Sequence, residues 1–224
     1  MPRFTTVPLP PLQALNARTM QTALSQSAQA TIHTDADAGP LVAFREARTD
    51  HDDVSLEALV ARAVVSALAA FPHINARIGV EGLAVYHGVN LGLMVVLEKG
   101  VIVPVVEDAD ALSLRELDAA LREITEKAHS GRLKPSETRR ATFTLASLAD
   151  YGIDSFTPIL VSEMIATLGI GRVRAVCEPD ETGCRRGHRI GLSLTFDHRA
   201  IHGVEAARFL HAISDALVDA EALA

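Results

Sequence analysis

Two runs of apolar and mostly β-branched residues, 89–97 and 101–106, are separated only by Glu98, Lys99 and Gly100. Such runs favour β-strands, and a three-residue connection that contains glycine predicts that the two strands form a hairpin. Further strands are expected at residues 74–78, 83–86, 141–145, 172–178 and 188–197. A chain with this pattern has to be built around a sheet with several tight turns.

Helical periodicity appears between these runs. Ser55 precedes apolar residues spaced by three and four positions from Leu56 to Phe71, which predicts a capped amphipathic helix that Pro72 ends. Ser113 and Glu116 have the spacing of a capping box and start another helix. Two further helices are expected around residues 12–24 and from about residue 204, and a short helical piece is expected near residue 163.

The remaining segments are expected to be irregular. Residues 31–49 predict a mixture of strand and loop, Asp50, Asp52 and Asp53 predict an exposed turn, and residues 150–158 form a loop rich in Gly and Asp. Because helices and strands alternate without a regular period, we expect an α/β fold. A two-layer sandwich with a mixed sheet fits this order better than a doubly wound parallel sheet does.

Composition bounds the class of protein. The chain has 224 residues, 48% of them hydrophobic, which suits a single domain over residues 1–224. Its formal net charge is −7 and no basic run exceeds two residues, so neither nucleic acid nor a membrane is expected as a partner. No apolar segment has the length of a membrane span or a signal peptide core. Cys177 and Cys184 have neither metal-ligand spacing nor a disulfide framework, so we expect reduced thiols, with Cys177 buried, in the cytoplasm.

The chemistry-bearing segment is residues 193–203, Ser-Leu-Thr-Phe-Asp-His-Arg-Ala-Ile-His-Gly. An apolar strand runs into Asp197, His198 and Arg199, and a helix begins directly afterwards. A histidine at such a strand end is able to act as a general base near neutral pH. Taken alone, the segment fits a hydrogen-bonded structural histidine at least as well.

The segment also resembles the DHRxxDG signature of the acyltransferase catalytic domains of 2-oxoacid dehydrogenase complexes, and the HxxxDG of chloramphenicol acetyltransferase. Other segments resemble that family in the same order. They are Val7-Pro8-Leu9 with Met20, Phe71-Pro72-His73-Ile74-Asn75-Ala76, Val89-Asn90-Leu91-Gly92, the run 101–109, Thr142-Phe143-Thr144-Leu145, and Gly152 to Ile159. The resemblance covers about residues 7–218.

The resemblance implies a chloramphenicol acetyltransferase-like sandwich that assembles as a homotrimer, with active sites at subunit interfaces. His198 is then the general base, which takes a proton from the acyl acceptor as the acceptor attacks the thioester of acetyl-CoA. Asp197, Arg199, Gly203 and Asn75 are expected to shape the site. The pantetheine arm of CoA is expected along Val103, Pro104, Phe156, Thr157 and Pro158.

Three positions depart from the family pattern. The Asp or Asn four residues after the base is His202, and the arginine of the first helix is Thr19, preceded by Arg18. In the family these two positions are expected to pair, so both partners have changed together. The serine expected to stabilise the oxyanion falls on Ala146. A different strand register would let Thr144 or Ser147 supply the hydroxyl.

His202 therefore has two interpretations: a polar residue at the start of a helix, or a second base or substrate contact. His198 and His202 are four residues apart, but two histidines without a third ligand do not indicate a metal site, and no metal is expected. Gly169-Ile170-Gly171 is too short for a phosphate loop and is expected to mark a helix end that leads into a strand.

Three functions are compatible with these residues. The sequence carries no lipoyl-domain signature or Pro/Ala-rich linker, so the first is a free-standing enzyme that transfers an acetyl group to the hydroxyl of a small molecule, such as a tetronate polyketide intermediate in natural-product biosynthesis. The second is the dihydrolipoyl acyltransferase core of a 2-oxoacid dehydrogenase complex. The third is a non-catalytic structural homologue, which Ala146 and His202 favour. Residues 219–222 offer no apolar anchor, which favours a trimer over a larger cage.

Overall fold

The computed structural model describes residues 2–47, 54–161, 163–180 and 183–223. Its helices, short 3₁₀ turns (η) and strands are, in chain order, α1 Pro11–Gln26, β1 Gln29–Asp37, α2 Gly39–Glu46, α3 Leu56–Ala70, η1 Pro72–Ile74, β2 Ala76–Gly79, β3 Gly82–Val85, β4 Leu91–Leu97, β5 Gly100–Ile102, β6 Val105–Val106, α4 Leu114–His129, η2 Pro135–Thr138, β7 Phe143–Ser147, η3 Ala149–Tyr151, β8 Ala166–Asp180, β9 Gly183–Asp197, α5 Gly203–Val218 and η4 Ala220–Leu223.

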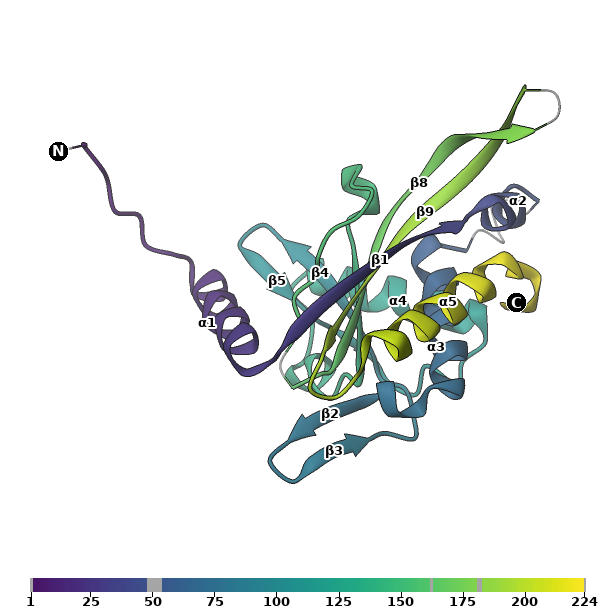
Figure 1. The fold of residues 1–224 in the computed structure, drawn as a ribbon. Coiled ribbons are helices and arrows are strands. Elements are labelled where there is room, and N and C mark those ends of the chain that lie inside the picture. Colours follow the sequence, from purple (N-terminus) through teal and green to yellow (C-terminus); the bar gives the residue numbers. More distant parts are fainter. Residues whose placement is uncertain (1, 48–53, 162, 181–182, 224) are drawn as a thin grey trace.

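Seven strands form one mixed sheet in the order β1-β9-β8-β7-β4-β5, with β6 paired to β4 as well. The β4–β7 and β7–β8 pairs are parallel and the other pairs are antiparallel. Helices α3, α4 and α5 cover one face of this sheet, while α1 lies beyond its opposite side (Figure 1). The predicted two-layer α/β sandwich with a mixed sheet is confirmed.

The two faces of the sheet differ in chemistry because side chains alternate along each strand. Leu91, Phe143, Leu168 and Leu194 face the helices and belong to the main hydrophobic core. The other face, which we call the open face, carries small and hydroxyl-bearing residues. In register across the strands, two of its rows are Gly92–Thr144–Thr167–Thr195–Thr31 and Met94–Ala146–Gly169–Ser193–His33.

The predicted helix starts are confirmed. The Ser55 hydroxyl accepts a hydrogen bond from the Ala58 N–H at 3.1 Å, which caps α3. Ser113 and Glu116 form the complete capping box of α4. The exposed turn predicted at Asp50, Asp52 and Asp53 lies outside the described residues.

Three local predictions are wrong. The segment predicted as strand and loop contains helix α2, whose first turn holds Gly39 and Pro40, residues that also signal a turn. Instead of a helical piece near residue 163, Met164 forms an isolated bridge with Arg77. Gly169-Ile170-Gly171 lies inside strand β8, because pairing with β7 and β9 extends that strand.

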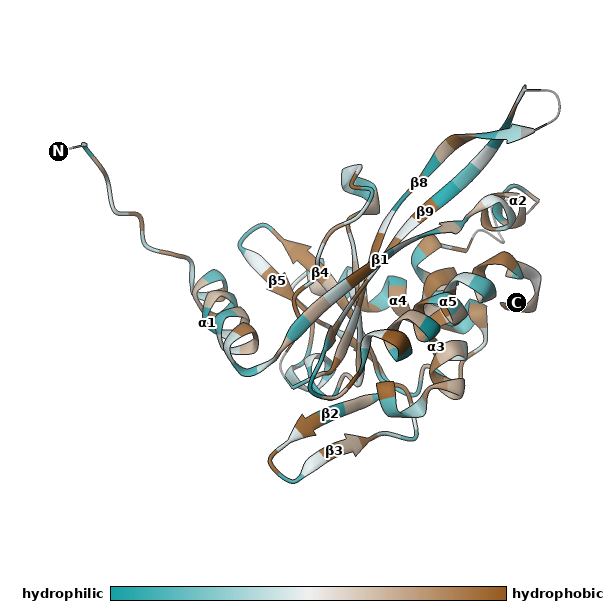
Figure 2. Ribbon diagram, in the orientation of Figure 1, coloured by the Kyte–Doolittle hydropathy of each residue, from teal (hydrophilic) through white to brown (hydrophobic). Residues whose placement is uncertain are grey.

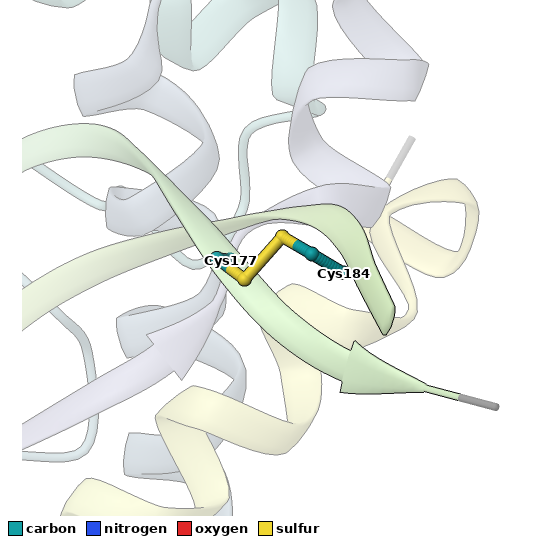
Figure 3. Close-up of a disulfide and its surroundings, with 2 residues drawn as sticks. All are labelled: Cys177 and Cys184. Atoms are coloured by element: carbon teal, nitrogen blue, oxygen red, sulfur yellow. A yellow bond between two sulfur atoms is a disulfide. The ribbon is translucent and has the colours of Figure 1, made fainter. Parts of the chain in front are cut away.

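Strands β8 and β9 are longer than predicted, with 15 residues each, and their hairpin projects beyond the body of the molecule (Figure 1). Near its tip Cys177 and Cys184 are joined by a disulfide, with their Cα atoms 5.5 Å apart (Figure 3). The predicted pair of reduced thiols is therefore wrong, and Cys177 is exposed. The antiparallel register places Cys177 opposite Arg186 and Pro179 opposite Cys184. The two cysteines therefore lie diagonally across the hairpin, two residues out of register.

The N-terminal segment lies apart from the core. Residues 2–10 have no regular secondary structure and extend away from the body (Figure 1). Phe4 and Val7 are 88% and 77% exposed, and of the α1 residues only Ala23 is buried. Apolar side chains are thus presented along this segment and on α1 (Figure 2).

Helix α1 is nevertheless fixed to the sheet edge by one side chain. The Asn16 amide accepts a hydrogen bond from the Val101 N–H at 2.8 Å and donates one to the Val101 carbonyl at 3.0 Å. This amide pairs with β5 as the backbone of another strand would.

None of the described helices has the length and apolar character that crossing a membrane requires.

Candidate active site

The segment from Asp197 to Gly203 forms a tight turn between β9 and α5. The Ala200 and Ile201 N–H groups both donate to the Asp197 carbonyl, at 2.9 and 3.0 Å. The His198 N–H donates to the Ala28 carbonyl at 2.9 Å, which ties the turn to the start of β1. The backbone of the turn is therefore held, while the His198 side chain is exposed to solvent.

Asp197 is the buried anchor of this turn, with 1% of its surface exposed. Its carboxylate accepts hydrogen bonds from the Arg199 guanidinium at 2.6 and 3.0 Å, from the Arg199 N–H at 3.1 Å and from the Ala28 N–H at 3.3 Å. Desolvation alone would raise the pKa of this carboxyl, but these hydrogen bonds and the Arg199 charge together lower the pKa below its usual value. An ionised Asp197 thus holds Arg199, the residue after His198, and also Ala28, whose carbonyl accepts from the His198 N–H.

His198 and His202 contact each other. Their ring centroids are 5.8 Å apart with an interplanar angle of 65°, an edge-to-face arrangement, and the Phe196 ring lies 5.7 Å from His198. His202 is the residue before the first turn of α5, so Gly203 begins that helix as expected. The His202 side chain makes no capping hydrogen bond.

A cleft of about 550 Å³ lies beside the turn. Its walls come from the end of α1, from β2 and from the start of the β9–α5 turn. Its lining residues include Ala23, Ser27, Ile78, Met164, Asp197 and Arg199. The cleft is thus lined by the two residues that flank His198, and His198 itself is not part of the lining.

The predicted CoA-binding residues gather on a different part of the molecule, the open face around β7. A Cβ at Gly92 would lie 2.9 Å from Val103, and one at Gly169 would lie 3.0 Å from the Phe156 ring and 3.3 Å from Pro158. Val103 and Phe156 thus pack where these two glycines leave space. Gly92 lies on β4 and Gly169 on β8, the two strands on either side of β7, which carries Ala146.

Two other predicted CoA-binding residues lie close by. The buried Pro104 accepts a hydrogen bond from the Leu93 N–H at 2.9 Å, and Thr157, between Phe156 and Pro158, is exposed.

The loop that carries Phe156 lies close against the sheet. A Cβ at either Gly171 or Gly191 would lie 1.9 Å from the Asp154 carbonyl oxygen, so only glycine at both positions permits this approach. The Arg172 N–H also donates to the Ile153 carbonyl at 2.8 Å.

The two candidate replacements for the oxyanion hydroxyl lie on opposite faces of the sheet. Thr144 is on the open face, fully buried, and donates to the Met164 sulfur at 3.1 Å. Ser147 is on the helix-covered face and donates to the Glu57 carboxylate at 3.0 Å. Ala146 itself occupies the open face between Met94 and Gly169. The register therefore brings Thr144, and not Ser147, to the face that carries Ala146.

Asn75 shapes a loop, as expected. Its amide donates to the Tyr86 and Gly88 carbonyls at 3.0 and 2.9 Å. Across the parts of the chain that the structure describes, no group of three or more His, Cys, Asp or Glu side chains is placed to hold a metal ion.

The family model for the 2-oxoacid dehydrogenases acyltransferase (catalytic domain) matches residues 1–224 of this chain. The chain belongs to this family. Among curated relatives, the dihydrolipoyllysine-residue acetyltransferase component of the acetoin cleaving system of Bacillus subtilis (strain 168) is 34% identical over 223 residues, which are 97% of this chain and 56% of that protein. The corresponding component of the pyruvate dehydrogenase complex of Mycobacterium bovis is 34% identical over 231 residues, covering 96% of this chain and 41% of the relative. The chain thus spans about half the length of these relatives.

Solved structures agree with this family. The dihydrolipoamide acetyltransferase (E2p) of Azotobacter vinelandii superposes with a TM-score of 0.92 at 29% identity, covering 99% of this chain and 94% of that one. Chloramphenicol acetyltransferase superposes at 0.60 with 15% identity, covering 90% of this chain and 94% of that one, and it shares the fold.

The A. vinelandii structure was reported as an investigation of the role of a serine, a histidine and an asparagine in the catalytic mechanism. In that enzyme the serine lies 52 residues before the histidine and the asparagine lies four after it. The same spacings from His198 lead to Ala146 and His202.

The sequence did not reveal the Asn16–Val101 pairing, the position of Met94 beside Ala146, or the cleft at the end of α1. Tertiary packing brings these residues together, and single-sequence periodicity carries no signal for partners 85 residues apart.

Proposed function

We propose that this chain catalyses acyl transfer between CoA and the thiol of a dihydrolipoyl group, with His198 as general base. Family membership and the names of the relatives support the reaction class and the dihydrolipoyl acceptor. The single observation that supports the base is an exposed His198 on a turn held by a buried, ionised Asp197.

His198 takes the proton of the acceptor thiol as the sulfur attacks the thioester carbonyl of acetyl-CoA. The tetrahedral intermediate then collapses, the carbon–sulfur bond to CoA breaks, and the imidazolium returns its proton to the departing thiolate. Acetyl-CoA and the dithiol are thereby converted to CoA and an acetyl thioester. The reaction needs no metal.

We further propose that the site forms between copies of the chain in a homotrimer. Ala146 and His198 are separated by two strand spacings across the sheet and by about five residues along it. With about 4.8 Å between strands and 3.3 Å per residue, one chain leaves them roughly 15–20 Å apart. A base and an oxyanion position that act on one carbonyl therefore have to come from two subunits.

Acetyl transfer to the hydroxyl of a small molecule is the second candidate, and the sequence suggested it first. Ala146 and His202 stand where the A. vinelandii enzyme has the serine and asparagine of its mechanism. A changed site favours a changed acceptor. The base, the thioester donor and the proton transfers are the same for a hydroxyl as for a thiol.

One assay separates these proposals. The purified chain is incubated with labelled acetyl-CoA and either dihydrolipoamide or a panel of small alcohols. Robust transfer to dihydrolipoamide supports the first candidate, whereas transfer only to an alcohol supports the second. No transfer to either class indicates a non-catalytic homologue and overturns both.

The base is tested in the same assay with His198→Ala. We expect a loss of about 10²- to 10⁴-fold in kcat, the range for removal of a general base. His202→Phe retains an edge-to-face partner for His198 and is expected to keep activity that His202→Ala loses. Unchanged transfer by His198→Ala would show that another group accepts the proton.

A further inference from the structure

A small cavity lies on the open face next to the Ala146 position. Its volume is about 50 Å³, and it lies between helix α1, strands β4 and β5 and the segment 159–161. Its lining residues are Asn16, Thr19, Met20, Met94, Val101, Val103, Ile159, Leu160 and Val161.

Met94 shows how close this cavity lies to the Ala146 position. It is the direct register partner of Ala146, on the same face of the sheet. Val103, which packs over the neighbouring Gly92, forms another part of the wall. The space that the lining encloses is therefore one strand away from the position that the carbonyl of a bound thioester approaches.

The cavity is firmly closed on the side of α1. The two hydrogen bonds between the Asn16 amide and the Val101 backbone fix this helix to β5. A Cβ at Gly100 would lie 2.9 Å from Leu12 and still closer to Asn16, so helix and strand are in close contact there. This packing holds the α1 wall of the cavity in place.

Size and polarity define the group that fits. A volume of about 50 Å³ is several times the roughly 10–15 Å³ that one water-sized sphere fills, so the space has room for a small group such as a methyl. None of the lining side chains is charged. An acyl group that ends in a carboxylate would bury its charge there without a partner, which is strongly unfavourable.

We propose that this cavity receives the acyl group of the thioester and restricts the enzyme to acetyl, with Met94 and Met20 as the residues that set the limit. The inference rests on the acyl transfer proposed above and adds its acyl specificity. The chain is therefore expected to accept acetyl-CoA in preference to butyryl-CoA and succinyl-CoA.

The test compares kcat/KM for acetyl-, propionyl-, butyryl- and succinyl-CoA in the full chain, with the acceptor found in the assay above. The wild-type chain is expected to prefer acetyl over butyryl and succinyl. Met94→Ala and Met20→Ala enlarge the cavity and are expected to raise the butyryl-to-acetyl ratio by about 10-fold or more, since one methylene changes selectivity by about 10- to 200-fold. Succinyl-CoA is expected to remain poor in both variants.

Leu15→Ala is the matched control, because Leu15 lies on α1, is 60% exposed and is not part of the lining. Met94→Leu, which conserves volume, keeps the fold and is expected to keep the wild-type ratio. A butyryl-to-acetyl ratio that Met94→Ala and Met20→Ala leave unchanged would overturn the acyl pocket while the proposed function stands. Absence of transfer by the wild-type chain from every thioester would overturn the proposed function, and the pocket with it.

Discussion

At the scale of single residues, Ala146 is the most informative position in the site. Its methyl group stands where the register and the 52-residue spacing place the serine of the A. vinelandii mechanism. Under the proposed function, a hydroxyl at this position is expected to donate to the developing oxyanion, and one such donor is worth about 10²- to 10³-fold in turnover.

We therefore expect Ala146→Ser to raise kcat, by about 10-fold or more, with little change in KM. Steady-state kinetics with acetyl-CoA checks this. Ser147→Ala is the control, because its hydroxyl lies on the other face, bonded to Glu57. An unchanged kcat for Ala146→Ser would contradict the expectation and show that a hydroxyl at this position does not reach the oxyanion.

At the scale of elements, the turn between β9 and α5 couples the base to the stability of the fold. Asp197→Asn removes the ionised partner of Arg199, and we expect a loss of about 2 kcal/mol in the free energy of unfolding at pH 7. Because the folded-state pKa of Asp197 is lowered, its stabilisation is complete above the unfolded value near 3.8 and is lost as the pH falls below that value.

Urea unfolding of the wild-type chain and of Asp197→Asn at pH 7, 5 and 3 measures this dependence. The difference between them is expected to be constant from pH 7 to 5 and to shrink at pH 3. A difference that is the same at all three values would mean that the carboxylate charge of Asp197 contributes nothing.

Elements also show where sequence reasoning succeeds and where it fails. The starts of α3 and α4 were predicted correctly because Ser55, Ser113 and Glu116 act on backbone groups within three residues. The β4–β5 hairpin was predicted for the same local reason. The lengths of β8 and β9 and the disulfide at their tip depend on pairing across the sheet, which the local pattern does not encode.

In the candidate site, too, some residues were found from local sequence and others depend on strand pairing. A short motif and a resemblance identified His198 and its turn, while the face on which Thr144 or Ser147 points depends on the register of β7 with its neighbours. That register is a tertiary property, and it separates two hydroxyls that the sequence treats alike.

At the scale of the whole molecule, the exposed N-terminal segment bears on assembly. Phe4 and Val7 are apolar and almost fully exposed in one chain, and we expect a neighbouring copy to cover them in the proposed homotrimer. Light scattering is expected to give about 72 kDa, three times the 23.9 kDa of one chain. Phe4→Ser with Val7→Ser should shift the population towards the monomer, whereas Gln13→Glu on the exposed side of α1 should not.

A mass near 24 kDa for the wild-type chain would contradict the interface proposal, because one chain keeps Ala146 and His198 apart. A mass many times larger would instead indicate a larger assembly. The chain is similar to the cubic core of the pyruvate dehydrogenase multienzyme complex, with a TM-score of 0.93 at 29% identity over 99% of this chain and 94% of that one.

The close approach of the Asp154 carbonyl to Gly171 and Gly191 has a consequence for how the proposed activity can evolve. Gly171 and Gly191, on adjacent strands, let the 152–158 loop lie close to the sheet, where the Phe156 ring packs over Gly169. A single methyl at either strand would lift the loop and reshape the donor side of the site without altering any residue that a substrate touches. New substrate preferences are therefore accessible through positions that an inspection of the ligand-contacting residues would pass over.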